Sequence, residues 1–218
     1  MRIVIAGGHG QIALRLERML AARGDEAAGI IRNPEQSDDL RKAGAEPVVL
    51  DLESATVEQA AEVLRGADAA VFAAGAGPSS GTARKDTVDR GAAVLFADAA
   101  ERAGVRRYVV VSSMGADPDH PGDEVFDVYL RAKGAADADV RSRSGLDWTI
   151  LRPGMLTNDA GTGQVLLAAS TGRGPVPRDD VAATLLELLD TPATAGLTLE
   201  LIAGNVPLAV AVKDIAGN

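Results

Sequence analysis

Apolar and polar positions follow two distinct periods along this chain. Short apolar runs predict six β-strands in the first 154 residues, at 2–7, 26–32, 46–52, 67–75, 106–113 and 146–154. The segments between them carry apolar residues three and four positions apart, which predicts helices at 12–23, 35–44, 56–65, 86–104 and 125–144. Strands that alternate with helices in this way are typical of βαβ units, whose parallel sheet is covered on both faces.

The last part of the chain is less regular. We predict a short strand within 161–177, a helix at 178–190 and another strand at 197–204. A loop rich in Gly, Pro and Asp is expected at 114–123. The whole pattern indicates the α/β class, with a doubly wound parallel sheet.

Composition and charge narrow the classes of partner. The 218 residues carry a formal net charge of −9 with a pI near 4.7, which argues against nucleic acid and membrane as partners, because both attract clustered Lys and Arg. The chain has no cysteine and only two histidines, His9 and His120, so we expect no metal site. No apolar run approaches the roughly 20 residues that span a bilayer. We expect a cytoplasmic monomer or homodimer whose ligands are small molecules.

A glycine cluster separates the first predicted strand from the first helix, with the spacing Gly7-x-x-Gly10-x-x-Ala13. The start of a helix presents unpaired backbone N–H groups and the positive end of the helix dipole, which together suit a phosphate. Gly7 allows a tight turn, Gly10 lets the backbone approach a diphosphate, and Ala13 lets helix and strand pack closely. This placement predicts a dinucleotide-binding loop, in which we expect His9 to shape the turn.

The residue after the second predicted strand indicates which dinucleotide binds. An acidic side chain there would bind the ribose hydroxyls of NAD, whereas Arg32 suits the 2′-phosphate of NADP. We therefore expect NADP(H) rather than NAD(H), with a solvated surface charge as the alternative reading of Arg32. Asp51 and Leu52 end the third strand and would flank the adenine. The residues that end the fourth strand are small enough for the cofactor to lie close, namely Ala73, Ala74 and Gly75.

Candidate catalytic residues follow the fifth strand. Ser112 and Ser113 end that strand, where the ligand crevice of an open α/β sheet lies. Tyr129 and Lys133 are four residues apart on a predicted helix, so both side chains lie on one face. A nearby cation lowers the pKa of a phenol, which suits a tyrosine that exchanges protons with an alcohol or ketone. The alternative is a packing tyrosine beside a surface lysine.

The motifs together resemble a known superfamily. In order along the chain they are IAGGHGQIA, RNPEQ, LDLE, VFAAGAG, YVVVSSMGA, YLRAKGAAD and LDWTILRPGMLTNDAGTG. This order is similar to that of the short-chain dehydrogenase/reductase superfamily, and most similar to its atypical NAD(P)-binding branch. That branch includes NmrA-like and biliverdin-reductase-B-like proteins and sequences named as NAD-dependent epimerases/dehydratases. The resemblance covers nearly the whole chain.

The resemblance implies a Rossmann-type fold in one NAD(P)-binding domain over 1–218. Its cofactor-binding core would be 1–150 and its small substrate-side extension, a C-terminal substrate lobe, would be 151–218. Tyr129 would donate the proton, and Lys133 would bind the nicotinamide ribose and tune the tyrosine. The implied cofactor-binding residues are Gly7, His9, Gly10, Gln11, Ile12, Arg32, Asp51, Leu52, Pro153, Gly154, Met155 and Leu156, to which we add Ser112.

The resemblance does not fix which residue occupies the position of the catalytic serine. We favour Ser113, with Ser112 second, whereas Met114 in that position would remove the hydroxyl donor. The first hypothesis is an NADPH-dependent oxidoreductase that passes hydride to a small carbonyl, quinone or flavin-like acceptor. The alternatives are a non-catalytic NADP(H)-binding redox sensor of the NmrA type and an NAD-dependent epimerase or dehydratase.

Overall fold

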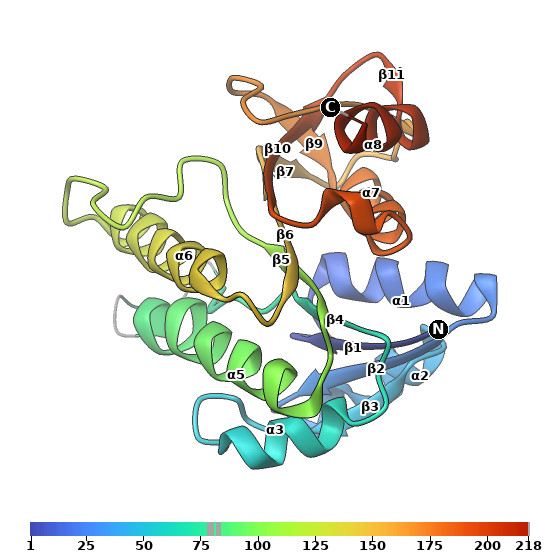
Figure 1. Cartoon of the computed structure of the whole chain (residues 1–218), viewed down its shortest axis with the longest axis vertical. Coiled ribbons are helices and arrows are strands. Elements are labelled where there is room, and N and C mark those ends of the chain that lie inside the picture. Colours follow the sequence, from blue (N-terminus) through green and yellow to red (C-terminus); the bar gives the residue numbers. More distant parts are fainter. Residues whose placement is uncertain (78–80, 82–83, 218) are drawn as a thin grey trace.

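The central feature is a twisted sheet, seen in a computed structural model that describes residues 1–77, 81 and 84–217. In the described residues the sheet has nine strands in the order β11-β8-β10-β6-β5-β4-β1-β2-β3 (Figure 1). From β10 to β3 every neighbouring pair is parallel. The strands are β1 Arg2–Ala6, β2 Glu26–Ile31, β3 Glu46–Val49, β4 Ala69–Phe72, β5 Arg107–Val111, β6 Asp147–Pro153, β8 Gln164–Ala168, β10 Leu197–Ala203 and β11 Val206–Pro207.

Helices cover both faces of this sheet. On one face α1 packs against α7, and on the other α3, α5 and α6 lie side by side (Figure 1). The apolar core accordingly divides into two clusters, one on each face. The α-helices are α1 Gln11–Arg23, α2 Ser37–Lys42, α3 Val57–Leu64, α5 Ala93–Ala103, α6 Val125–Ser142, α7 Arg178–Leu189 and α8 Leu208–Ala216, with short helical turns η1 Pro34–Gln36 and η3 Pro192–Thr194.

The strand order places a topological switch between β1 and β4. The chain leaves β1 to build β2 and β3 on one side, and returns to build β4, β5 and β6 on the other. Ligands of open α/β sheets bind beyond the carboxyl ends of the strands at such a point. The predicted Rossmann-type, doubly wound α/β fold is thus confirmed.

The C-terminal part differs in detail from the sequence expectation. β8 pairs antiparallel with β10 and with β11, so one edge of the sheet is antiparallel. The strands β7 Met155–Thr157 and β9 Pro175–Pro177 form a separate two-stranded sheet. The strands β7, β9 and β11 were not predicted, because elements of two or three residues carry too few positions to show a period. The nine-residue helix α8 was missed because its apolar residues at 208–212 are consecutive and show no helical period. Across the described residues, no helix combines the length and apolarity needed to cross a bilayer.

The helix expected at 86–104 begins in a π-helical segment, η2 Lys85–Ala92, which leads directly into α5. A π-helical turn adds a residue to each turn, so it rotates the buried face relative to a regular helix. Val94 and Leu95, which the α-helical period places in the core, are only half-buried, whereas Phe96 and Ala97 are fully buried. A π-helical stretch within a helix often marks a functional site.

The carboxylate of Glu17 is buried beneath the glycine loop. Glu17 lies on α1, is 0% exposed, and in the described structure neither carboxylate oxygen has a hydrogen-bond partner. It contacts the backbone of β2 so closely that a Cβ atom added at Gly29 would lie 2.6 Å from Oε1. Burial raises the pKa of Glu17 to about 8, so the side chain is mainly neutral at pH 7.

We predict that Glu17→Gln removes a pH-dependent loss of stability. Folded Glu17 keeps its proton up to about pH 8, whereas the unfolded side chain loses it near 4.5. The free energy of unfolding of the wild type should therefore fall as the pH rises through this window, by up to about 1.4 kcal/mol per pH unit from this group. Glutamine is neutral throughout and should flatten that slope in urea titrations.

The matched control is Glu62→Gln, which changes an exposed glutamate on α3. It should leave the slope of stability against pH unchanged. A Glu17→Gln variant with the wild-type slope would mean that Glu17 ionises normally in the folded protein.

Candidate functional site

The loop between β1 and α1 contacts the ends of β2 and β4, the two strands that flank β1 in the sheet. Gly7 has a φ of +80° and packs so tightly that an added Cβ would lie 2.6 Å from the Cα of Ala74. The N–H of Gly8 donates to the carbonyl oxygen of Ile30 at 2.9 Å. Gly10 is the N-cap of α1 and has no side chain to cap the first turn. The N–H groups of that turn are therefore directed out of the helix end, where they can bind an anion.

Two cavities adjoin at this loop. The first has a volume of about 330 Å³ and lies over the ends of β1, β2 and β3; the second, of about 590 Å³, lies over β5 and α6. Both are lined by Gly10 and by Ala73, Ala74 and Gly75, which follow β4. A ligand with two ends could therefore extend from one cavity into the other past these small residues.

The structure brings nearly all of the predicted site residues to these cavities. Met155 is the exception, since its side chain is 69% exposed on the edge strand β7 and lies outside both. The first cavity is lined by Gly7, His9, Gly10, Arg32, Asp51, Leu52, Ala73, Ala74 and Gly75. The second is lined by Gly10, Gln11, Ile12, Ala73, Ala74, Gly75, Ser112, Ser113, Tyr129, Lys133, Pro153, Gly154 and Leu156.

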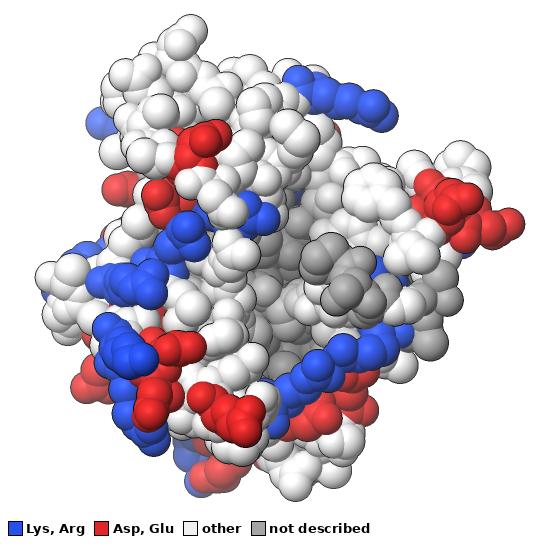
Figure 2. Space-filling model, turned by 180° about the vertical axis from the view of Figure 1, so that it is seen from behind, with Lys and Arg blue, Asp and Glu red and all other residues white. Residues whose placement is uncertain are grey.

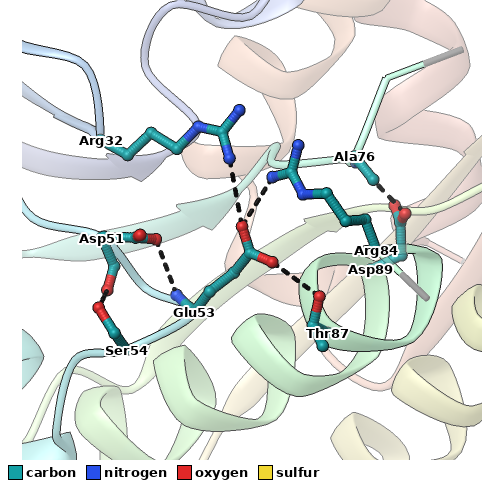
Figure 3. Close-up of polar contacts among 8 residues, drawn as sticks. All are labelled: Arg32, Asp51, Glu53, Ser54, Ala76, Arg84, Thr87 and Asp89. Carbon is teal, nitrogen blue, oxygen red and sulfur yellow. Dashed lines mark hydrogen bonds and ion pairs between the residues drawn. The ribbon is translucent and has the colours of Figure 1, made fainter. Parts of the chain in front are cut away.

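At the far end of the first cavity, two arginines converge on one carboxylate (Figure 3). Oε2 of Glu53 lies 2.7 Å from Nη2 of Arg84 and 3.3 Å from Nη1 of Arg32, and Oε1 accepts a 2.7 Å hydrogen bond from Thr87. The hydrogen bond from Arg84 is the main reason that the pKa of Glu53 lies below its usual value. Asp51 also lines this cavity, so two guanidinium groups face two carboxylates here, and Arg32 is the more exposed and less tightly paired of the two arginines.

Sequence reasoning found Arg32 at this end but missed Glu53 and Arg84. Glu53 lies in the LDLE motif, where a turn follows β3 and Oδ1 of Asp51 accepts from the N–H of Glu53 at 3.1 Å. Arg84 comes well after β4 in the chain, and no local pattern relates it to β3. Only the packing of the helical segment that begins at Lys85 brings it to Glu53.

In the second cavity, Tyr129 lies between an aromatic ring and two ammonium groups. Its ring stacks on that of Phe126 with centroids 5.7 Å apart. Nζ of Lys85 lies 5.3 Å from the Tyr129 ring centroid, and Nζ of Lys133 lies 6.0 Å from it. Lys85 was missed because the helix was predicted to begin at 86, although Lys85 and Asp89 are one helical turn apart.

The ammonium group of Lys133 is held by the ends of two strands. It donates to the carbonyl oxygens of Ala74 and Val111, each at 3.2 Å, and forms an ion pair of 3.4 Å with Oδ1 of Asp89. Asp89 is itself 0% exposed and accepts from the N–H of Ala76 through Oδ2. Lys133 thus joins α6 to the ends of β4 and β5, between the two cavities. By contrast, Lys85 donates to the carbonyl oxygen of Gly77 at 2.6 Å.

The two serines have different surroundings. Oγ of Ser112 is buried and donates to Oδ2 of Asp137 at 2.9 Å, and the same oxygen accepts from Arg152 at 2.7 and 2.9 Å. Ser113 is half-buried, lines the cavity, and donates to the carbonyl oxygen of Met114 at 3.2 Å. Ser112 therefore supports the wall of the site through Asp137, while Ser113 is the hydroxyl with freedom to turn toward a ligand.

We predict that Asp137→Ala costs about 3–5 kcal/mol of unfolding free energy, because it leaves Arg152 largely buried without its carboxylate. Asp139→Ala on the same helix is the matched control. Its partner Arg143 also pairs with Asp98 and Glu101, so the loss should stay under about 1 kcal/mol. Urea unfolding of both variants measures the difference. Equal losses of unfolding free energy would show that the buried pair of Asp137 and Arg152 stabilises the fold no more than the pair of Asp139 and Arg143.

Comparison with known proteins agrees with this geometry. The sequence profile of the family described as NAD(P)H-binding matches residues 7–192. The Bacillus subtilis (strain 168) protein named "Uncharacterized sugar epimerase YhfK" is 37% identical over 216 residues, which cover 99% of this chain and 100% of that protein.

Two solved structures share the whole fold. A Bacillus halodurans protein with the provisional name of an NAD-dependent epimerase/dehydratase is 37% identical, with a TM-score of 0.90 over 98% of this chain and 99% of its own. The oxidoreductase ylbE from Lactococcus lactis is 27% identical, with a TM-score of 0.86 over 100% of this chain and 98% of its own. The resemblance seen in the sequence motifs is confirmed, and the chain belongs to the NAD(P)H-binding family of Rossmann-type proteins.

Proposed function

We propose that this protein is an NADPH-dependent oxidoreductase that transfers hydride to a small carbonyl, quinone or flavin-like acceptor. One observation carries the proposal: the cavity that contains Tyr129 and Ser113 adjoins the glycine loop through Gly10 and the small residues after β4. A cofactor bound at the loop would therefore have its reactive end beside a proton donor.

The residues present fit a phosphorylated dinucleotide. The uncapped first turn at Gln11 and Ile12 would hold the diphosphate. Arg32 and Arg84 would hold a 2′-phosphate, since the side chain of Arg32 is 55% exposed and its contact with Glu53 is long, at 3.3 Å. Asp51 and Leu52 would lie beside the adenine. At the other end Pro153, Gly154 and Leu156 would lie beside the nicotinamide.

The chain's own residues would manage the proton and the acceptor oxygen. When bound, the nicotinamide supplies the hydride. The Tyr129 hydroxyl would donate a proton to the acceptor oxygen, and Ser113 would turn from the Met114 carbonyl to hold that oxygen. The ammonium groups of Lys85 and Lys133 lie against the Tyr129 ring and would help to hold it in place for this transfer.

An epimerase or dehydratase that uses tightly held NAD is a second candidate, favoured by the names of the two relatives that are 37% identical. Such an enzyme regenerates its cofactor in each turnover, so it would not consume NADPH. A redox sensor of the NmrA type would bind NADP(H) without turnover. Measuring NADPH consumption with a panel of quinones, flavins and aldehydes separates these functions from the proposed one.

We predict that Tyr129→Phe lowers turnover by at least about tenfold and leaves NADPH affinity nearly unchanged, because only the hydroxyl is lost. Turnover is followed by NADPH absorbance, and affinity by NADPH fluorescence. Tyr108→Phe is the control, since Tyr108 is 0% exposed in the apolar core beneath the sheet. Unchanged turnover of Tyr129→Phe would leave Tyr129 with a packing role.

We also predict that Arg32→Ala raises the dissociation constant of NADPH by about tenfold or more, since it removes a charge-assisted contact to the 2′-phosphate. NADH lacks that phosphate, so its affinity should hardly change. Arg41→Ala on α2, an exposed arginine outside the cavity, serves as the control for the loss of surface charge. An equal loss of affinity for both cofactors would contradict the assignment of Arg32.

A further inference from the structure

The second cavity contains an arginine, Arg178, that forms no ion pair with a carboxylate of the described residues. Arg178 is the first residue of α7, and its side chain lines the cavity that contains Tyr129. Its Nη1 donates to Oδ1 of Asn158 at 2.9 Å, a contact that orients the guanidinium without neutralising its charge. Among the residues that the structure describes, no acidic side chain pairs with it.

The two aspartates that follow Arg178 are bound elsewhere. Asp179 accepts from Nε of Arg15 at 2.5 Å and from the N–H of Gly161 at 3.3 Å. Asp180 is buried and accepts from the N–H groups of Thr162 and Gly163 at 3.0 and 2.9 Å. The carboxylates nearest in sequence thus hold α1 and the loop before β8, and the charge of Arg178 remains available to a ligand.

Positive charge exceeds negative charge in this cavity. Its described lining contains Lys85, Lys133 and Arg178 but only one carboxylate, Asp89, which already pairs with Lys133. The excess is local, because the chain as a whole has a net charge of −9 and acidic and basic side chains are interspersed on the face shown in Figure 2. A positive cavity in an acidic protein indicates an anionic ligand.

An exposed apolar wall completes the cavity. Phe126 is 63% exposed, Val125 43% and Leu156 36%, and all three line it. The Phe126 ring continues the aromatic surface of Tyr129, on which it stacks. Exposed apolar side chains that gather at a cavity typically contact an apolar ligand.

We propose that Arg178 binds a carboxylate or phosphate group of the acceptor, whose planar apolar body packs against Phe126, Val125 and Leu156. The planar guanidinium can donate two parallel hydrogen bonds to either anion, which suits it to this role. Calling this ligand the acceptor rests on the oxidoreductase function proposed above. The diphosphate of the cofactor is the other source of the same chemistry, since Gly10, Gln11 and Ile12 line this cavity too.

Matched pairs of probes test the proposal by direct binding to the full chain saturated with NADP⁺. The pairs are FMN with riboflavin, and 4-carboxybenzaldehyde with its methyl ester, so that each pair differs by one anionic group. In at least one pair the charged member should bind about tenfold more tightly than the neutral one. If neither pair shows this preference, the proposal is wrong. Because binding is measured without turnover, the result does not depend on whether hydride transfer occurs.

The variants Arg178→Ala and Arg178→Gln locate the preference. Each should remove it by weakening the charged probe about tenfold, with little effect on the neutral one. Arg173→Ala is the control, since Arg173 is an exposed arginine near α7 that lies outside the cavity. If the Arg178 variants instead weaken NADP⁺ about tenfold and keep the preference between probes, Arg178 binds the cofactor diphosphate and the proposal is overturned.

Discussion

The close contact of the first glycine loop with the ends of β2 and β4 is the constraint on which the rest of the site depends. Gly7 adopts a φ of +80° against Ala74, and Gly8 donates to Ile30. Side chains at these positions would push the loop away from the sheet. Because the loop lies this close, the uncapped start of α1 lies at the topological switch between β1 and β4, where both cavities begin.

The same close packing explains the unusual burial of Glu17. A helix that approaches the sheet through glycines covers the side chain directed inward from α1, so Glu17 is 0% exposed. For a carboxylate this raises the pKa to about 8. The close approach of the glycine loop and the buried neutral acid are therefore two consequences of one short distance between α1 and β2.

Most charged side chains in the site form ion pairs, but two arginines, Arg32 and Arg178, are paired less tightly or not at all with described carboxylates. Asp89 pairs with Lys133, Asp137 with Arg152, and Glu53 with Arg84. Arg32 shares Glu53 at a longer distance, and within the described part of the chain Arg178 pairs only with the neutral Asn158. The less tightly paired cations thus lie at opposite ends of the joined cavities. In the proposed function, Arg32 would meet the phosphate of a nucleotide and Arg178 an anionic group on a second ligand.

Much of this protein follows from its sequence alone. The hydrophobic periods locate β1 to β6 and the helices between them, because each is long enough to show its period, and the glycine spacing marks the loop. Local spacing also places Tyr129 and Lys133 on one helix face.

The tertiary structure alone decided the remainder. It places Arg84 beside Glu53, Lys85 beside Tyr129, and Arg178 in the second cavity. It also turns the buried face of 86–104 through a π-helical segment and adds an antiparallel edge to the sheet. These features join residues that are far apart in the chain or depend on which acid binds which base. No local period encodes them, since packing selects among many equivalent charged residues.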